Sequence, residues 1–303
     1  MRRLPALLLC LPLLVSGCGG GDQPDKPKAS EGGGSLPTVQ GDAGKKPAVK
    51  APGGKAPAKL ETKVLTEGDG AAVQKGDLLV AHYLGQTWRD NKVFDNSYDR
   101  GEPAGFGIGM GQVIKGWDEG LVGKKVGSRV MLVVPPDLGY GPNGNPQGGI
   151  KGDDTLVFVV DVLNRFGKDS AAEGTAKSDV PADLPKVQSA PGKKPSVQVK
   201  GTKPPKQPKS ALLVAGSGPE IDQSKNLVVQ AIQVDYKTGK EAFSSWENSP
   251  VSIKADRVPG LAEAIKGQNV GSRVLLTLPG AKAKDAQPGQ GPAAVVLDVV
   301  GMF

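Results

Sequence analysis

Residues 126–135 read VGSRVMLVVP, and residues 270–279 read VGSRVLLTLP. Each segment opens on a Val-Gly-Ser step and continues as an apolar run up to a proline, which is the pattern of a buried strand. A short helical signal precedes each segment at the same distance, as 116–121 (GWDEGL) and 260–265 (GLAEAI). Two copies are too few for a solenoid, so the repetition predicts a duplicated domain.

Further strand-like runs complete the two copies. They lie at 78–84 and 155–163 in the first copy, and at 227–234 and 293–301 in the second. In each copy, short strands bounded by Gly, Pro, Asn and Asp outnumber the single short helix. We therefore predict the α+β class, with two domains at 61–166 and 211–303, each an antiparallel β-sheet wrapped on one short helix.

Two low-complexity segments, 18–60 and 167–210, precede these domains. Both are rich in Lys-Pro and Ala-Pro pairs and hold few large apolar residues. Such a composition buries too little surface to offset the entropy of ordering the chain. We predict a disordered tether at 18–60 and a disordered Lys/Pro linker at 167–210, the tether having a typical reach of about 35 Å.

The formal net charge of +7 is concentrated in the low-complexity segments. Residues 61–166 hold eleven basic against fourteen acidic residues, and residues 211–303 hold nine of each. A nucleic-acid-binding protein places its basic residues on a folded element, beside aromatics or a known module. The charge distribution therefore argues against a nucleic-acid partner.

The N-terminus reads as a targeting segment. Arg2 and Arg3 form a basic start, and an apolar stretch at 4–15 follows that is too short to span a bilayer. The residues Val-Ser-Gly before Cys18 resemble a bacterial lipobox, in which the cysteine is acylated and becomes the first residue after cleavage. This resemblance predicts a signal peptide at 1–17, and the alternative is a plain secreted protein with a chance cysteine.

A lipid on Cys18 would serve as the membrane anchor and would place the protein at the outer face of the cytoplasmic membrane. Two acyl chains hold a protein stably on a bilayer. Cys10 lies within the removed peptide, so the mature chain would keep one cysteine and could form no internal disulfide.

The first copy carries a set of short motifs around aromatic and acidic residues. In chain order they are His82-Tyr83, 93–101 (VFDNSYDRG), 112–120 (QVIKGWDEG), 138–141 (LGYG) and 155–158 (TLVF). Over about a hundred residues, this order resembles the FKBP-type peptidyl-prolyl cis-trans isomerases. The resemblance implies an FKBP-like fold for both copies and isomerisation of X-Pro peptide bonds by the first.

The resemblance also implies a role for each site residue. Tyr140 and the backbone N–H of Ile114 would hydrogen-bond substrate carbonyls, while Asp95 would orient Tyr83. The pocket that takes the proline ring would be lined by Phe94, Phe106, Val113, Trp117 and Phe158, with Trp117 as its floor. Many relatives carry a histidine where Gly144-Asn145-Pro146 stands here, which puts the contacts of this loop in doubt.

The chemistry of X-Pro isomerisation fits this residue set. Rotation about the bond breaks amide resonance against a barrier of ~18–20 kcal/mol but needs no covalent step. The sequence offers a single His, no metal-ligand cluster and no nucleophile constellation, so we expect neither cofactor nor metal. A dry aromatic pocket can accept a twisted amide, which has less charge separation, better than a planar one. Phe106 or Phe158 taken alone would more often be an ordinary core residue.

The second copy lacks most of this set. Aligned to the first copy, it replaces Tyr83 by Ala231, Asp95 by Ser244 and Trp117 by Leu261. Phe243 and Val258 are kept, but residues 281–292 offer no counterpart of Tyr140. We predict that 211–303 keeps the fold and is inactive as an isomerase.

Three functions therefore remain open. The first is a foldase that isomerises X-Pro bonds in unfolded exported proteins and is inhibited by macrolides such as rapamycin. The alternatives are a non-catalytic holdase chaperone and a peptide-binding envelope lipoprotein. Nothing in the sequence argues for more than a monomer.

Overall fold

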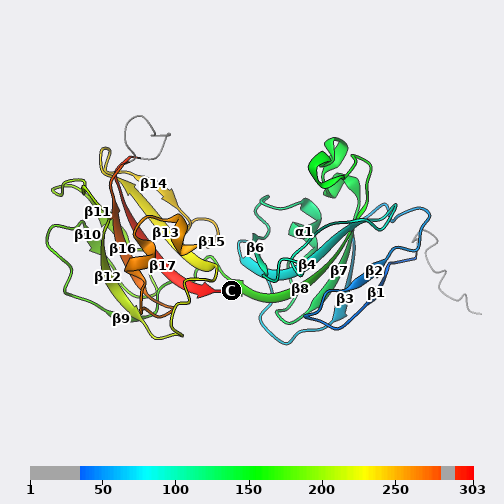
Figure 1. Ribbon diagram of the computed structural model, residues 1–303, viewed down its shortest axis with the longest axis horizontal. Coiled ribbons are helices and arrows are strands. Elements are labelled where there is room, and N and C mark those ends of the chain that lie inside the picture. The colour runs from blue at the N-terminus through cyan, green and yellow to red at the C-terminus, as the bar shows by residue number, and fades with distance from the viewer. Residues whose placement is uncertain (1–34, 281–290) are drawn as a thin grey trace, which may run out of the picture. The chain divides into compact units, whose positions relative to one another are not determined.

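The computed structural model describes residues 35–280 and 291–303. Strands far outweigh helices, and they form two large antiparallel sheets and two small hairpins (Figure 1). The prediction of antiparallel sheets with few helices is confirmed. Among the described residues, none of the helices is long and apolar enough to cross a membrane.

The first sheet has the strand order β3-β7-β8-β4-β5, with β6 also paired to β4. Its strands are β3 (Glu61–Thr66), β4 (Leu78–Thr87), β5 (Val93–Asn96), β6 (Ala104–Gly107), β7 (Arg129–Val134) and β8 (Leu156–Phe166). The two central strands alternate residues between two buried faces, because both faces of this sheet are covered.

Helix α1 (Lys115–Gly120) covers one face of the first sheet. Gly116 and Gly120 allow the close approach, since a Cβ on Gly116 would lie 2.5 Å from Val134 and one on Gly120 would clash with Leu132. Trp117 is thereby pressed into the apolar core of this face. Three 3-10 turns, η1 (Pro136–Leu138), η2 (Gly141–Asn143) and η3 (Pro146–Gly148), build the loop between β7 and β8.

The second sheet repeats the arrangement of the first. Its order is β14-β13-β17-β16-β12-β9, with β15 also paired to β13. The elements are β9 (Gly174–Ala176), β12 (Lys209–Gly216), β13 (Leu227–Asp235), β14 (Glu241–Ser244), β15 (Val251–Ile253), η4 (Ala255–Arg257), α2 (Leu261–Ala264), β16 (Arg273–Leu278) and β17 (Ala293–Met302). The five strands from β14 to β12 correspond one to one with those from β5 to β3.

The prediction of disorder at 18–60 and 167–210 is contradicted where the structure has strands in these segments, and residues 18–34 lie outside the described part. Strands β1 (Thr38–Gln40) and β2 (Ala48–Lys50) form one antiparallel hairpin. Strands β10 (Lys186–Gln188) and β11 (Ser196–Gln198) form the other.

The first hairpin packs on the face of the first sheet that α1 leaves open. Leu36, Val39 and Val49 contact a cluster that includes Met131 and Val133. The segment needs few apolar residues of its own, because the sheet supplies most of the buried surface. The second hairpin covers the corresponding face of the second sheet, with Leu184, Val187, Val197 and Val199 against Ile232, Leu275 and Val296.

The two hairpins also repeat in sequence. Residues 36–51 read LPTVQGDAGKKPAVKA, and residues 184–199 read LPKVQSAPGKKPSVQV. The repeated unit is therefore a hairpin followed by a sheet.

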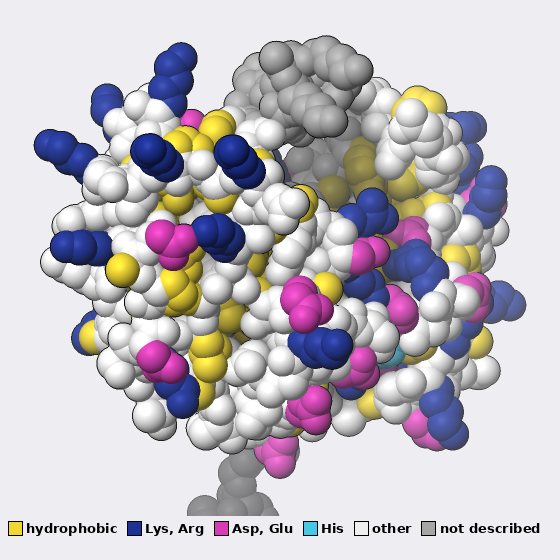
Figure 2. Space-filling view, turned by 60° about the vertical axis from the view of Figure 1, so that its left-hand side comes forward, with side chains coloured by type: hydrophobic (Ala, Val, Ile, Leu, Met, Phe, Trp, Pro, Cys, Tyr) yellow, Lys and Arg dark blue, Asp and Glu magenta, His cyan; other side chains and the backbone are white. Residues whose placement is uncertain are grey.

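All nine lysines of 167–210 are exposed, and Figure 2 shows basic side chains projecting from one face with hydrophobic ones lying between them.

A buried ion pair joins each hairpin to its sheet. Arg129 binds both oxygens of Asp161 at 2.6 and 2.7 Å and also donates to the carbonyls of Gly41 and Lys45 in the turn of the first hairpin. Arg273 and Asp298 make the corresponding pair in the second sheet, where Arg273 donates to the carbonyls of the second hairpin turn, Ala190 and Lys193. Buried charges need such partners to offset the loss of hydration.

Candidate active site

One cavity of about 690 Å³ lies on the α1 side of the first sheet. All nine residues that the sequence singled out in this copy line it: Tyr83, Phe94, Asp95, Phe106, Val113, Ile114, Trp117, Tyr140 and Phe158. They come from four strands, from α1 and the residues before it, and from the β7–β8 loop. The expected lipid anchor, Cys18, lies outside the described residues.

Trp117 forms the floor of the cavity and is only 4% exposed. Three rings meet it edge to face, Tyr83 at 5.6 Å, Phe106 at 4.8 Å and Phe158 at 5.4 Å between centroids. This is the preferred geometry of aromatic pairs. Gly85 keeps the wall open, because a Cβ there would lie 2.7 Å from the ring of Phe94 and 2.8 Å from that of Phe158.

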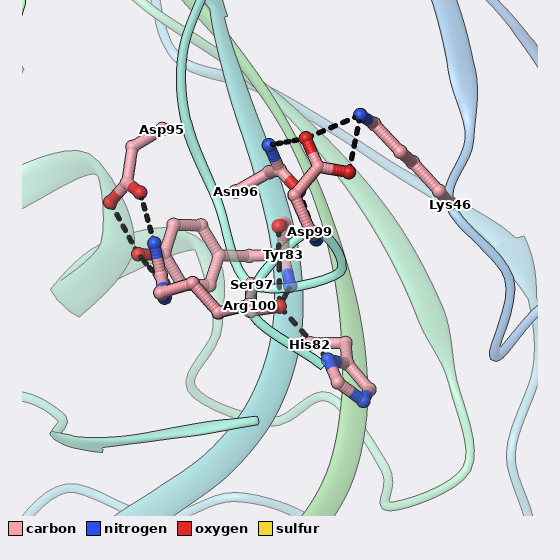
Figure 3. A network of polar contacts seen from close by, with 8 residues as sticks. All are labelled: Lys46, His82, Tyr83, Asp95, Asn96, Ser97, Asp99 and Arg100. Carbon is pink, nitrogen blue, oxygen red and sulfur yellow. Dashed lines mark hydrogen bonds and ion pairs between the residues drawn. The ribbon is translucent and has the colours of Figure 1, made fainter. Parts of the chain in front are cut away.

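The polar side of the cavity is a closed network of three groups (Figure 3). The Tyr83 hydroxyl donates to Oδ2 of Asp95. Arg100 binds Oδ1 of Asp95 at 2.5 Å, donates to the Tyr83 oxygen at 2.8 Å and lies over the Tyr83 ring. Both carboxylate oxygens of Asp95 therefore have a hydrogen-bond partner within the network, and neither is left as an unpaired proton acceptor.

Burial, followed by the hydrogen bond to Asp95, raises the pKa of Tyr83 to about 12. The phenol therefore stays protonated near neutral pH and keeps donating to the carboxylate. Arg100 was not singled out from the sequence, although it follows Asp95 by five residues within the same motif. A cation at that distance after a carboxylate in a turn is the signal that could have identified it.

The segment after β5 is fixed to β4 by Ser97. The Ser97 hydroxyl accepts the Tyr83 N–H at 2.9 Å and contacts Nδ1 of His82 at 2.9 Å. The backbone N–H of Ser97 donates to the Tyr83 carbonyl. His82 stacks on Tyr98 with 4.9 Å between ring centroids. His82 does not line the cavity. Its contacts with Ser97 and Tyr98 support the structure around β4.

Asp118 shapes the rim next to α1. Its carboxylate accepts the N–H of Gly109 at 2.7 Å and that of Gly111 at 2.8 Å, so it holds the segment that leads to Val113 and Ile114. Ile114 is extended, and the helix begins at the next residue. The backbone of Ile114 therefore lies at the edge of the cavity rather than inside the helix.

The β7–β8 loop presents Tyr140, which is 38% exposed. Asn145, the departure noted in the sequence, accepts the Gly148 N–H through its side chain at 3.2 Å and pairs with Ile150 through its backbone. Asn145 thus shapes its own turn and is absent from the cavity lining.

The second sheet confirms two of the three predicted replacements and corrects the third. Ala231 and Leu261 occupy the places of Tyr83 and Trp117. Asp95 pairs with Gly85, and the residue in the same register of β14 is Phe243, not Ser244. Phe243 therefore does not replace Phe94, and its side chain is 46% exposed.

The place of the cavity is taken by aliphatic core in the second sheet. By the strand registers, Ile253 stands where Phe106 does and Val295 where Phe158 does. Both pack with Ala231, Val258 and Leu261 in a single apolar cluster. The predicted absence of a Tyr140 counterpart falls mainly on residues 281–290, outside the described part.

Residues 70–163 match the family model of the FKBP-type peptidyl-prolyl cis-trans isomerases. An FK506-binding protein of Streptomyces anulatus is 44% identical over 35% of this chain and 86% of its own length. FK506-binding protein 1 of Debaryomyces hansenii is 47% identical over 36% and 96%. FkpA from Escherichia coli, a solved structure, shares 44% identity over 36% of this chain and 48% of that one, at a TM-score of 0.33.

The family match at 70–163 includes every residue that lines the cavity. The chain therefore belongs to the FKBP-type peptidyl-prolyl cis-trans isomerase family, and its first sheet carries the isomerase domain of this enzyme.

Proposed function

We propose that this enzyme isomerises X-Pro bonds in exported proteins and thereby assists their folding at the outer face of the cytoplasmic membrane. The observation that carries the catalytic part is the single cavity in which Tyr83, Asp95, Tyr140 and the aromatic rings around Trp117 meet. The location rests on the lipobox-like sequence before Cys18.

The cavity would act on the conformation of the substrate rather than on its bonds. A proline ring would rest on Trp117, with Phe94, Phe106 and Phe158 around it. The apolar walls favour the twisted amide, in which charge separation is smaller than in the planar one. Isomerisation that takes tens to hundreds of seconds unaided would then be accelerated without a nucleophile.

The polar groups would orient the peptide. Tyr140 and the backbone N–H of Ile114 donate to substrate carbonyls on the open side of the cavity. Asp95 has both oxygens bound, to Tyr83 and to Arg100. Its part is therefore to hold the Tyr83 ring and supply a fixed negative field, not to take up a proton.

The test is isomerase activity on a Leu-Pro peptide, with residues 19–303 as the enzyme. We expect catalysis that rapamycin inhibits and that a Tyr140→Phe, Asp95→Ala double variant greatly reduces. A folded protein without activity would refute the catalytic proposal. Acylation is tested separately by palmitate labelling of cells, where the Cys18→Ser variant should carry no label and leave the membrane fraction.

A holdase is the second candidate, because the second sheet keeps its fold while its cavity is filled with aliphatic side chains. On this reading the chain, a monomer, would bind unfolded segments through the surface around exposed Phe243. Suppression of aggregation should then survive the double variant and fall in Phe243→Ser. If aggregation is suppressed only by catalytically active protein, the holdase proposal fails.

A further inference from the structure

The turn of the first hairpin contacts the loop that carries the polar residues of the site. Lys46 Nζ lies 2.7 Å from both carboxylate oxygens of Asp99. Asp99 in turn accepts from the Asn96 side chain at 2.9 Å and donates its N–H back to it at 2.9 Å. In sequence, Asn96 directly follows Asp95, and Asp99 directly precedes Arg100. By binding Asp99, Lys46 holds the 95–100 loop from the side of the hairpin (Figure 3).

The same loop is tied to the buried ion pair on which the hairpin rests. The Tyr98 hydroxyl donates to Oδ2 of Asp161 at 2.7 Å. That oxygen also accepts the N–H of Gly44, two residues before Lys46, at 2.8 Å. The hairpin turn and the 95–100 loop therefore share one buried carboxylate, and the position of one fixes the position of the other.

The far end of the hairpin segment reaches the turn between β4 and β5. The Ala51 N–H donates to the side chain of Asn91 at 2.7 Å, and the Trp88 indole donates to the Gly54 carbonyl at 3.1 Å. The Trp88 N–H donates to Thr155, where the Tyr140 loop ends. The segment 36–54 thus contacts the 95–100 loop directly and is linked through Trp88 to the end of the Tyr140 loop. It nevertheless lies outside the family match at 70–163.

We propose that the β1–β2 hairpin, residues 36–54, is a positioning element of the isomerase site and that Lys46 is its positioning residue. The proposal rests on the isomerase activity of the first sheet. Lys46 does not line the cavity, and it acts by holding Asp95 and Arg100 in the geometry that orients Tyr83. A hairpin that merely covered an apolar face would leave the activity indifferent to this one side chain.

The second sheet provides a matched control. Lys194 stands 148 residues after Lys46 and binds Glu247, the counterpart of Asp99, at 2.8 Å. The loop it holds carries neither an equivalent of Asp95 nor a cavity. Loss of Lys194 should therefore disturb the same kind of contact without any effect on catalysis.

The experiment compares Lys46→Ala, Lys46→Arg and Lys194→Ala in the chain 19–303, at low and high salt. We expect Lys46→Ala to lower kcat/KM by about two- to fivefold, the range open to one exposed ion pair, with an unchanged melting temperature. Lys46→Arg should restore most of the activity, and Lys194→Ala should match the wild type. Because the pair is exposed, high salt should bring the wild type down toward Lys46→Ala.

A double variant separates positioning from general weakening. Once Lys46 is gone, Asp99→Asn should cause no further loss of kcat/KM, because it removes the charge that Lys46 binds but keeps an oxygen that can accept from Asn96. Equal activity of wild type and Lys46→Ala at low salt would overturn the proposal. So would a melting temperature that falls in step with activity, or an equal loss in Lys194→Ala. Absence of activity in the wild type would instead refute the proposed function.

Discussion

The backbone N–H of Tyr83 and the backbone N–H of Ala231 make the same hydrogen bond, each to the hydroxyl of a serine fourteen residues further on. The distances are 2.9 Å to Ser97 and 2.8 Å to Ser245. Each serine returns its own N–H to the carbonyl of the same partner at 3.0 Å. These bonds use only backbone atoms of Tyr83 and Ala231, so they do not depend on the side chain at this position. The same backbone can therefore carry a tyrosine in the cavity or an alanine in the core.

Replacement of Trp117 by leucine should weaken catalysis and keep the fold. Leucine already occupies the corresponding place in the second sheet, at Leu261. We expect a native far-UV spectrum and a kcat/KM reduced by about tenfold or more, which corresponds to roughly 1.4 kcal/mol. Trp246→Leu, a tryptophan change away from the cavity, is the control. Unchanged activity in Trp117→Leu would show that the floor is not needed.

Tyr83→Phe should distinguish the contribution of the Tyr83 hydroxyl to activity from that of the ring. The ring contacts with Trp117 and Phe106 remain, but Asp95 and Arg100 lose the group between them. A lost hydrogen bond to a charged group is worth about 1.5–3 kcal/mol, so we expect activity to fall by tenfold or more. Tyr236→Phe, in the turn directly after β13, should have no effect on the Leu-Pro assay. Full activity of Tyr83→Phe would mean that the network does not orient the site.

Arg129→Met should destabilise the first sheet strongly. It leaves Asp161 buried without its partner, and breaking such a pair costs about 3–5 kcal/mol. Urea unfolding measures the loss, and Arg273→Met should give a similar loss in the second sheet. Adding Asp161→Leu to Arg129→Met should recover part of the stability. If the single variants unfold at the wild-type midpoint, the pair is not what secures each hairpin.

Tyr83 also predicts one component of the loss of stability at alkaline pH. Its pKa is raised to about 12 in the folded state from 10.0. A group with a raised folded pKa stabilises the fold fully below its unfolded pKa and loses that contribution as pH rises through the folded one. We expect the Tyr83 contribution to be complete at pH 9 and to be lost between about pH 10 and pH 12. Melting temperatures of Tyr83→Phe should lack this component of the alkaline decline.

His82 predicts an acid sensitivity that belongs to the first sheet alone. Burial lowers the pKa of His82 below 6.5, against the opposing field of Asp161. A depressed histidine stabilises the fold above its unfolded pKa, and that contribution is lost as pH falls through the folded one. Gln230 holds the same register in the second sheet. His82→Gln should therefore reduce the loss of stability below pH 6.5 in thermal melts and leave isomerase activity intact.

The cavity residues could be predicted because short motifs carry them and strand alternation places them on one face. The exception at Phe243 shows the limit of that reasoning. Aligning one phenylalanine on another is natural in sequence, but a one-residue shift sends a strand side chain to the opposite face. Both sheets have the same bulge, after Gly85 in one and after Gln233 in the other. The offset of 148 residues that relates Tyr83 to Ala231 therefore also relates Asp95 to Phe243.

The hairpins were missed for a different reason. Average composition describes 35–60 as spacer, whereas Leu36, Val39 and Val49 recur at intervals that bury them against a sheet distant in sequence. Comparison of 36–51 with 184–199 would have revealed the repeat. The pairing of Lys46 with Asp99, 53 residues apart, depends on tertiary folding and is beyond any local pattern.

Arg129 is buried beneath the first hairpin and bonds to its turn. An isolated isomerase domain therefore has to include this hairpin. A fragment starting at residue 61 would contain the whole family match at 70–163, yet it would uncover Met131 and Val133 and remove two carbonyl partners of Arg129. Such a fragment should self-associate through its bared sheet face. We therefore expect the smallest self-sufficient unit to begin at Leu36, and a truncation has to keep the hairpin segment.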